Sequence, residues 1–408
     1  MADRLIDGGF ENWTTSTDLT SWTETIAGTS TVTRESTIKR SGKYSCSLIV
    51  DASDSSVYIY QTVKLVAGRK YRLVIWYKNS ISGKTASWNL KDSGSNVYLQ
   101  SDGTWGGSAS IVLPNSISWR PYVIEFTAHV SYTNYVITIG KSSAASSTIY
   151  LDNVSMFSMN VCGFAWDNKW DSGTLTTSGN ATNFPANNTR HRWHLRPWRS
   201  ANLASPEWLV LDAGANIDVL AGFVRYTNFQ SNATVLFQAN TADSWAAPAA
   251  NVSVAANTEI IPCVWAAAQS YRYWRIAVTD ATNPSNYVAA GRVYFGPVFE
   301  PVRNYVLGGG MRADIDPSAI SESDDGQASS ILKTKYKSGD FSFERITAAD
   351  KGQFENLYNN VGVAKPFFFC QDMGDPWNEA WYVYISELDI TQEYDYRFTV
   401  RLSLREAR

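Results

Sequence analysis

Carboxylates and aromatic rings are the side chains of this sequence whose types could support chemistry. The chain has 38 Asp and Glu residues but only three histidines, His129, His191 and His194. It contains no G-x-S-x-G motif, no phosphate-binding loop and no G-x-G-x-x-G after a strand. Glycoside hydrolysis needs two carboxylates that face one cleft, and the sequence alone nominates no such pair. We therefore expect a protein that is not an enzyme and requires no cofactor.

Aromatic residues are unusually frequent, with 16 Trp, 22 Tyr and 17 Phe. Rings cover large areas and stack on flat ligands, although β proteins also use them in strands. In the stretch 70–78 (KYRLVIWYK), alternation places Arg72 and Trp76 on the more polar face. Trp88, Tyr98 and Trp105 fall in the Gly- and Ser-rich stretch 82–110, which we expect to form long loops beside a cleft. For each ring, packing in the core or at its rim is the alternative.

An arginine-rich segment, RHRWHLR (190–196), precedes Trp198 and Arg199. Two histidines at i, i+3 without a neighbouring Cys, Asp or Glu make a weak metal ligand set. The arginines and tryptophans could hold an anionic sugar or nucleic acid, but a solvated loop or a subunit contact is the favoured alternative. The net charge of −3 argues against nucleic acid as a partner.

The four cysteines are far apart in the sequence, at positions 46, 162, 263 and 370. No C-x-x-C pair is present, so the spacing suggests neither a zinc site nor a redox motif, and free buried thiols are favoured over disulfides. The N-terminal residues have no apolar signal-peptide core, and no stretch of about 18 apolar residues occurs. We expect synthesis in the cytoplasm without a signal peptide and no direct membrane insertion.

The elements that must position these side chains are mostly strands. Residues 1–158 alternate apolar and polar side chains in short runs, which predicts a β-sandwich. The expected strands are 45–51, 56–65, 70–78, 122–128, 135–140 and 148–157. Residues 159–300 form a second β segment, with strands expected over 207–215, 218–228, 233–240, 271–280 and 291–301.

Residues 301–408 predict a smaller β-rich α+β domain with one helix. Thr347 and Asp350 resemble a capping box, apolar residues follow at helical spacing (Phe354, Leu357, Tyr358 and Val361), and Gly362 ends the pattern. Strands are expected over 330–337, 340–346, 380–388 and 393–406. The acidic residues Glu322, Asp324 and Asp325 are interpreted as a solvated turn.

The first segment resembles a carbohydrate-binding module of the family 4/9 type. The motifs that carry the resemblance are LIDGGFENW (5–13), GKYSCSL (42–48), AGRKYRL (67–73) and YLDNV (150–154). The resemblance implies a jelly roll, with carbohydrate bound by Trp76, Arg72, Trp88, Tyr98 and Trp105. It also implies a structural calcium ion at Glu11 and Asp152, since calcium prefers carboxylate oxygens. The alternative is that these two carboxylates satisfy backbone donors.

The second segment resembles a discoidin-like, galactose-binding-type sandwich, through Trp198-Arg199-Ser200, WLVLDAG (208–214) and YWRI (273–276). These are scaffold motifs: they place a buried strand at 209–211 and offer Asp212 or a carbonyl as a partner for Arg275. The fold class is therefore mainly β, with two jelly-roll or galactose-binding-like sandwiches (1–158 and 159–300) before the 301–408 domain.

The order of motifs from about residue 160 onward resembles minor tail or tail-tip proteins of tailed bacteriophages and prophages. It runs through CGFAWDN (162–168), Trp198-Arg199-Ser200, YRYWRI (271–276) and GRVYFGP (291–297). The resemblance implies a structural component of a phage tail, located in the virion, with other tail proteins and copies of itself as partners. Its sandwiches would bind host-surface glycans. The alternative is a stand-alone lectin-like or enzyme-accessory carbohydrate-binding protein.

Overall fold

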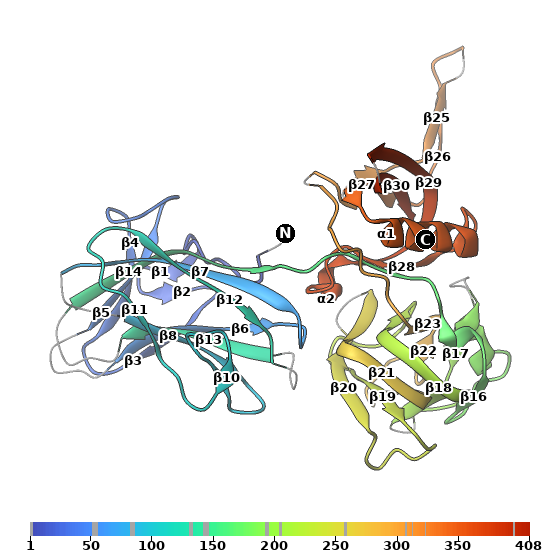
Figure 1. Ribbon diagram of the computed structural model, residues 1–408, viewed down its shortest axis with the longest axis horizontal. Coiled ribbons are helices and arrows are strands. Elements are labelled where there is room, and N and C mark those ends of the chain that lie inside the picture. Colours follow the sequence, from blue (N-terminus) through green and yellow to red (C-terminus); the bar gives the residue numbers. More distant parts are fainter. Residues whose placement is uncertain are drawn as a thin grey trace. The chain divides into compact units, whose positions relative to one another are not determined.

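The computed structural model divides into two compact units, Met1–Asn160 and Val161–Arg408 (Figure 1). It describes residues 3–50, 56–81, 86–129, 134–141, 147–191, 196–203, 206–256, 259–306, 308–311, 313–322, 324–394 and 396–408. The described chain is mainly β and is built from antiparallel sheets, so the predicted fold class is confirmed.

The first unit is a β-sandwich of two large sheets. The seven-stranded sheet contains β10 (Trp105–Gly106), β9 (Tyr98–Leu99), β8 (Ala86–Asp92), β13 (Asn134–Lys141), β6 (Val57–Lys64) and β3 (Thr23–Ile26) in that order, with β11 (Ile111–Leu113) beside β8. The five-stranded sheet has the order β12 (Arg120–Thr127), β7 (Lys70–Asn79), β14 (Ser147–Ser158), β5 (Ser45–Val50) and β4 (Thr31–Glu35). A small pair, β1 (Trp13–Thr15) and β2 (Asp18–Leu19), completes the unit.

Alternation of side chains explains how the two sheets enclose one core. On β7 the residues Tyr71, Leu73, Ile75 and Tyr77 are fully buried, and the side chains between them lie on the opposite face. The inward residues of both sheets form a single cluster, and burying each aliphatic side chain contributes about 1.5–3 kcal/mol. All six strands expected in residues 45–157 are present within a few residues. The expectation of long loops over 82–110 is wrong for part of that stretch, because its described residues include β8, β9 and β10, which are joined by short turns and loops.

The second unit contains two six-stranded sheets. The first has the order β16 (Thr174–Thr177), β18 (Glu207–Arg225), β21 (Ile260–Thr279), β19 (Thr234–Asn240) and β20 (Ala250–Ala255), with β23 (Arg292–Gly296) beside β18. The second has the order β15 (Gly163–Ala165), β28 (Phe367–Cys370), β29 (Ala380–Tyr394), β30 (Arg397–Glu406), β27 (Tyr336–Ile346) and β24 (Ala313–Ile315). Two pairs stand apart from them: β17 (Trp198–Arg199) with β22 (Ala289–Ala290), and β25 (Ala319–Glu322) with β26 (Ala328–Ile331).

Strand β15 belongs to the second of these sheets, although it comes before the strands of the first sheet in the sequence. It pairs with β28 of that second sheet. Phe164 of β15 also forms a bridge with Phe299, with backbone hydrogen bonds of 2.9 and 3.0 Å. The boundaries expected at residues 158 and 300 stay predictions, but the residues just after 160 belong to the C-terminal sheet.

Helix α1 (Ala348–Val361) packs on the second sheet as the sequence indicates. The Thr347 side chain accepts a hydrogen bond from the Asp350 backbone, and Gly362 ends the helix with a positive φ of 52°. Phe354, Leu357 and Val361 are buried in the cluster of that sheet. Tyr358 is exposed, so its predicted place on the apolar face is wrong. The remaining short helices are α2 (Pro376–Glu379) and two 3-10 turns, η1 (Lys169–Asp171) and η2 (Ala186–Arg190).

The four cysteines are free and buried, which confirms the preference for thiols over disulfides. Burial raises the pKa of each thiol well above its usual value. These groups are therefore protonated core side chains at neutral pH. In the described residues, no helix has the length and apolar character needed to cross a bilayer.

Candidate functional site

The five residues predicted to bind carbohydrate do not form one site. Arg72 and Trp76 lie on β7, and Trp88, Tyr98 and Trp105 lie on strands of the other sheet. Because alternate residues of a strand point to opposite faces, these side chains fall on three different surfaces of the sandwich. Each surface therefore has to be considered separately.

The outer face of the five-stranded sheet carries Arg72 and Trp76, and both are already engaged. The Arg40 guanidinium lies 3.7 Å from the centre of the Trp76 ring, in a cation–π contact. Arg72 faces Glu125 on β12 and donates a hydrogen bond of 3.0 Å from Nε to that carboxylate. Arg40 therefore covers one face of the Trp76 ring, and a ligand that stacks on that face would have to displace Arg40.

Trp88 and Trp105 point inward from the seven-stranded sheet. Trp88 is only 1% exposed and meets Tyr122 of the opposite sheet edge-on at 5.7 Å. It is a core residue and cannot serve as an exposed platform, which corrects the expectation for this position. Trp105 is half-buried; its indole donates a 2.7 Å hydrogen bond to the Thr127 carbonyl and packs against Tyr135. Trp105 closes the edge of the core.

The outer face of the seven-stranded sheet presents open rings among small polar side chains. Three cross-strand rows make up this surface, which we call the tyrosine face. They are Thr25–Tyr58–Gly140–Ser87, Thr23–Tyr60–Thr138–Asn89 and Thr62–Val136–Lys91–Tyr98. Tyr98 is thus the one predicted residue on this face, with the Lys91 ammonium 5.8 Å from its ring centre. The side chains of Tyr58, Tyr60, Asn89 and Thr138 have no partner within the described part of the chain.

Gly140 lets the Tyr58 ring lie close to the sheet. A Cβ atom on residue 140 would come within 2.3 Å of Tyr58 Cδ1 and 2.2 Å of the Val57 carbonyl oxygen. No side chain fits in that space, so the ring covers the backbone of the neighbouring strand. A ring restrained by a close backbone contact can bind a ligand at little cost in conformational entropy.

A local pattern could have indicated Tyr58 and Tyr60. In VYIYQTVK (57–64) the apolar residues at 57, 59 and 63 alternate with these two tyrosines. Alternation places the tyrosines on the outer face, but it cannot show that Gly140 lies beneath one of them. That pairing joins residues 82 positions apart, so only the strand register reveals it.

Glu11 and Asp152 both bind the loop formed by residues 40–44. Asp152 Oδ2 accepts hydrogen bonds from the backbone N–H groups of Arg40 (2.7 Å) and Ser41 (3.1 Å). Glu11 Oε1 accepts one from Lys43 at 2.9 Å. Burial raises the pKa of Asp152, with a smaller contribution from the negative charge of Glu11.

The hydrogen bonds of these two carboxylates agree with the alternative in which they satisfy backbone donors. Calcium prefers six to eight oxygen ligands, whereas N–H donors directed at the same oxygens repel a cation. Among the described residues, no group of three or more His, Cys, Asp or Glu side chains is placed to hold a metal. Glu11 and Asp152 satisfy backbone donors, and a calcium ion at these residues stays a prediction.

In the second unit, the motifs that suggested a discoidin-like scaffold are structural. Leu209, Val210 and Leu211 are buried, as expected. Asp212 pairs with Arg272 (2.7 and 2.8 Å) rather than with Arg275. Arg272 lies on β21, opposite the irregular stretch of β18 that begins after residue 212. The Arg272 guanidinium lowers the pKa of Asp212 to about 2.

The arginine-rich segment 190–196 is described only in part, because residues 192–195 lie outside the described residues. Arg190 donates hydrogen bonds to the carbonyls of Trp170, Ser172 and Gly173, at 2.8–2.9 Å. This arginine therefore ties η2 to the turn after η1. Its side chain has a structural role.

Comparison with known proteins gives similarity to solved structures only. No protein-family model matches the chain, and no curated protein matches it. The carbohydrate-binding module TmCBM61, in complex with β-1,4-galactotriose, is 20% identical over 39% of this chain and 99% of its own, with a TM-score of 0.30. A structure described as CBM4 is 13% identical over 38% of this chain and 99% of its own, with a TM-score of 0.28.

A phage protein is also among the similar structures. The enzymatically active domain of tailspike protein 4 from bacteriophage CBA120 is 19% identical, over 38% of this chain and 21% of its own, with a TM-score of 0.30. At these identities and TM-scores, none of the similarities establishes a family or a ligand for this chain.

Proposed function

We propose that this chain is a non-catalytic glycan-binding protein and that the tyrosine face of the first unit holds the glycan. The observation that carries the proposal is the pair of outward-pointing, partly exposed rings, Tyr58 and Tyr60, with Tyr58 in close contact with Gly140. The resemblance of residues 1–158 to a family 4/9-type carbohydrate-binding module agrees with it. Carbohydrate-binding modules are also among the solved structures that resemble the chain.

The chemistry of the tyrosine face suits a sugar chain. A pyranose ring has an apolar face of C–H groups that packs on an aromatic ring, and hydroxyl groups at its edge that exchange hydrogen bonds. Tyr58 and Tyr60 are two residues apart on one strand, a separation of about 7 Å, so one polysaccharide can contact both rings. Asn89 and Thr138 lie in the same cross-strand row as Tyr60 and offer both donors and acceptors.

Binding measurements on the full chain test this proposal. A glycan array would identify a ligand, and calorimetry would then compare the wild type with Tyr58→Ala and Tyr60→Ala. Removing a stacked ring is expected to weaken binding about tenfold, equivalent to about 1.4 kcal/mol. The matched control is Trp76→Ala, on the other outer face, which should leave the affinity unchanged. Loss of binding in Trp76→Ala alone would move the site to the five-stranded sheet, and no binding by the wild type would overturn the proposal.

A structural role in a phage tail is the second function we propose. It rests on the hairpin β25–β26, whose two strands pair with each other and extend away from the rest of the second unit (Figure 1). Three apolar side chains on or beside the hairpin are strongly exposed: Ile320 (74%), Ile331 (65%) and Leu332 (84%). An isolated two-stranded hairpin is marginally stable in water, and such apolar exposure is typical of contact surfaces.

In this role the hairpin would contact neighbouring subunits or other tail proteins in the virion, with the protein made in the host cytoplasm. Light scattering of the pure protein is expected to show an oligomer, and the double variant Ile320→Asp/Leu332→Asp is expected to shift it toward monomer without changing the circular dichroism. Electron cryo-microscopy of the parent particle would place the chain. A wild type that stays monomeric and is absent from the particle would favour the stand-alone lectin-like alternative.

A further inference from the structure

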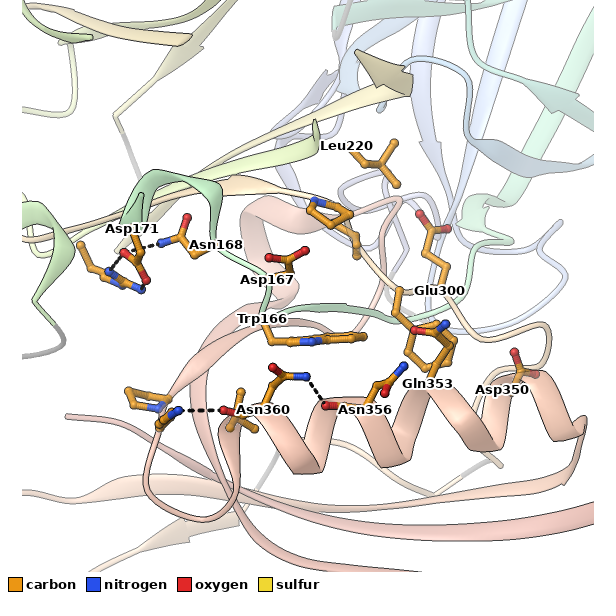
Figure 2. A pocket seen from close by; sticks show the side chains of 17 residues that line it. Trp166, Asp167, Asn168, Asp171, Leu220, Glu300, Asp350, Gln353, Asn356 and Asn360 are labelled. Carbon is orange, nitrogen blue, oxygen red and sulfur yellow. Dashed lines mark hydrogen bonds and ion pairs between the residues drawn. The ribbon is translucent and has the colours of Figure 1, made fainter. Parts of the chain in front are cut away.

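A polar pocket in the second unit surrounds an indole ring. It is open on one side, has a volume of about 1000 Å³, and is lined mainly by the segment after β15, the segment after β23 and the exposed side of α1. In Figure 2 the flat ring of Trp166 lies between Asp167 and the side chains that α1 presents, and Glu300 points toward the same space. A pocket of this size accommodates a ligand of two or three sugar rings.

The walls of this pocket are fixed by a common aromatic core. Phe164 and Phe299, which bridge through their backbones, contact Phe354 of α1 at centroid distances of 5.4 and 5.2 Å. Trp166 meets Phe299 edge-on at 6.1 Å. The three lining segments are therefore joined directly beneath the pocket, and the indole is held in place before any ligand arrives.

Hydrogen-bonding groups around the indole are available to a ligand. The side-chain amides of Gln353 and Asn356 and the indole N–H of Trp166 have no partner among the described residues. Asn360, on the same side of α1, donates to the Asn356 carbonyl at 2.8 Å, which leaves the Asn356 amide itself unengaged. An aromatic ring beside unengaged amide donors and acceptors is the combination that a neutral sugar ring requires.

The charges of the lining select against acidic ligands. Four carboxylates line the pocket (Asp167, Asp171, Glu300 and Asp350), against two cations, Arg292 and Lys365. Both cations are engaged: Arg292 pairs with Asp171 at 2.6 Å, and Lys365 donates to the Asn360 carbonyl at 3.1 Å. Asp167 also pairs with Lys169, at 2.6 Å, but the carboxylates of the lining still outnumber its cations. A carboxylate or sulfate on a ligand would therefore meet an excess of negative charge there.

We propose that the Trp166 pocket is a second saccharide-binding site, separate from the tyrosine face, and that it accepts neutral or amino sugars and excludes acidic ones. The sugar ring stacks on the Trp166 indole, and its hydroxyl groups exchange hydrogen bonds with Gln353 and Asn356. Glu300 accepts hydrogen bonds from the opposite wall. The inference does not depend on glycan binding by the first unit.

Calorimetry on the full chain carrying Tyr58→Ala and Tyr60→Ala tests the pocket alone. The probes are galactotriose, cellotriose, chitosan trimer and N-acetylchitotriose, with trigalacturonic acid as the acidic comparison. At least one uncharged or amino-bearing probe is expected to bind, and trigalacturonic acid is expected not to bind. Failure of all the uncharged and amino-bearing probes, or preference for trigalacturonic acid, would overturn the proposal. If the wild type binds a probe but the protein with both tyrosine changes does not, the tyrosine face is the sole site.

Variants of the lining then locate the bound sugar. Trp166→Ala is expected to weaken binding at least about tenfold. The matched control is Trp245→Ala, in the same unit but outside the pocket lining, which should have no effect. Because Trp166 also packs on Phe299, the exposed helix changes Gln353→Ala and Asn356→Ala provide a second measurement that does not disturb the core. If Trp166→Ala, Gln353→Ala and Asn356→Ala each bind with the affinity of the wild type, the assignment of the sugar to this pocket is contradicted.

Discussion

The two outer faces of the first unit have similar side-chain alternation but differ in what lies over them. On the five-stranded sheet, Arg40 stacks on Trp76 and Glu125 pairs with Arg72. On the seven-stranded sheet, the side chains of Tyr58 and Tyr60 have no hydrogen bond, ion pair or ring contact within the described part of the chain. An outward-pointing aromatic residue is therefore only a candidate platform. The segments that fold over it decide whether a ring face remains open.

The largest expected effect is the difference in stability loss between a change at the buried Trp88 and one at the outward-pointing Tyr60. Trp88→Ala removes a buried ring that contacts the opposite sheet, and it should lower the free energy of unfolding by about 3–5 kcal/mol. Tyr60→Ala, on the outer face of the same sheet, should change it far less. Denaturant unfolding of both variants measures the difference. Equal losses would contradict the placement of Trp88 in the core and Tyr60 on the surface.

A change at Gly140 tests how the Tyr58 ring is held. Gly140→Ala forces a Cβ against the Val57 carbonyl and the Tyr58 ring, so we expect a loss of about 1–3 kcal/mol in stability and weaker glycan binding. Thr138→Ala, two residues earlier on β13, adds no atoms and serves as the stability control. Unchanged affinity in a folded Gly140→Ala protein would show that the Tyr58 ring does not need this position to bind.

Uncovering Trp76 tests the other face. Arg40→Ala removes the cation–π contact and should cost about 0.5–1 kcal/mol at this partly exposed position. Because the proposed site lies on the opposite sheet, glycan affinity should stay at the wild-type value. A gain in affinity that Trp76→Ala then abolishes would show that the five-stranded face becomes a binding surface once it is opened.

The smallest expected effect concerns calcium. Since Glu11 and Asp152 accept backbone hydrogen bonds, neither adding calcium nor chelating it should shift the thermal unfolding midpoint. Glu11→Ala, in contrast, should lower the midpoint by removing the acceptor of the Lys43 N–H group. A rise in the midpoint with calcium that disappears in Asp152→Ala would restore the metal site implied by the resemblance of this segment.

Much of the secondary structure followed from short-range patterns. Alternation placed β7 and β6, and a capping residue with helical spacing placed α1 between Thr347 and Gly362. The same patterns failed where tertiary contacts intervene. Tyr358 has the spacing of the buried face but is exposed, and the Gly- and Ser-rich stretch 82–110 contains strands because the sheet supplies partners for it.

The sequence by itself determined which residues point to which side of each strand, because that property repeats every two residues and depends only on the local backbone. Only the tertiary structure decided which of those side chains remain available. Arg40 covers Trp76 across 36 positions, Gly140 seats Tyr58 across 82, and residues near 166, 300 and 356 meet at one pocket. Such contacts depend on strand order and register, which the packing of the whole chain fixes and no local pattern encodes.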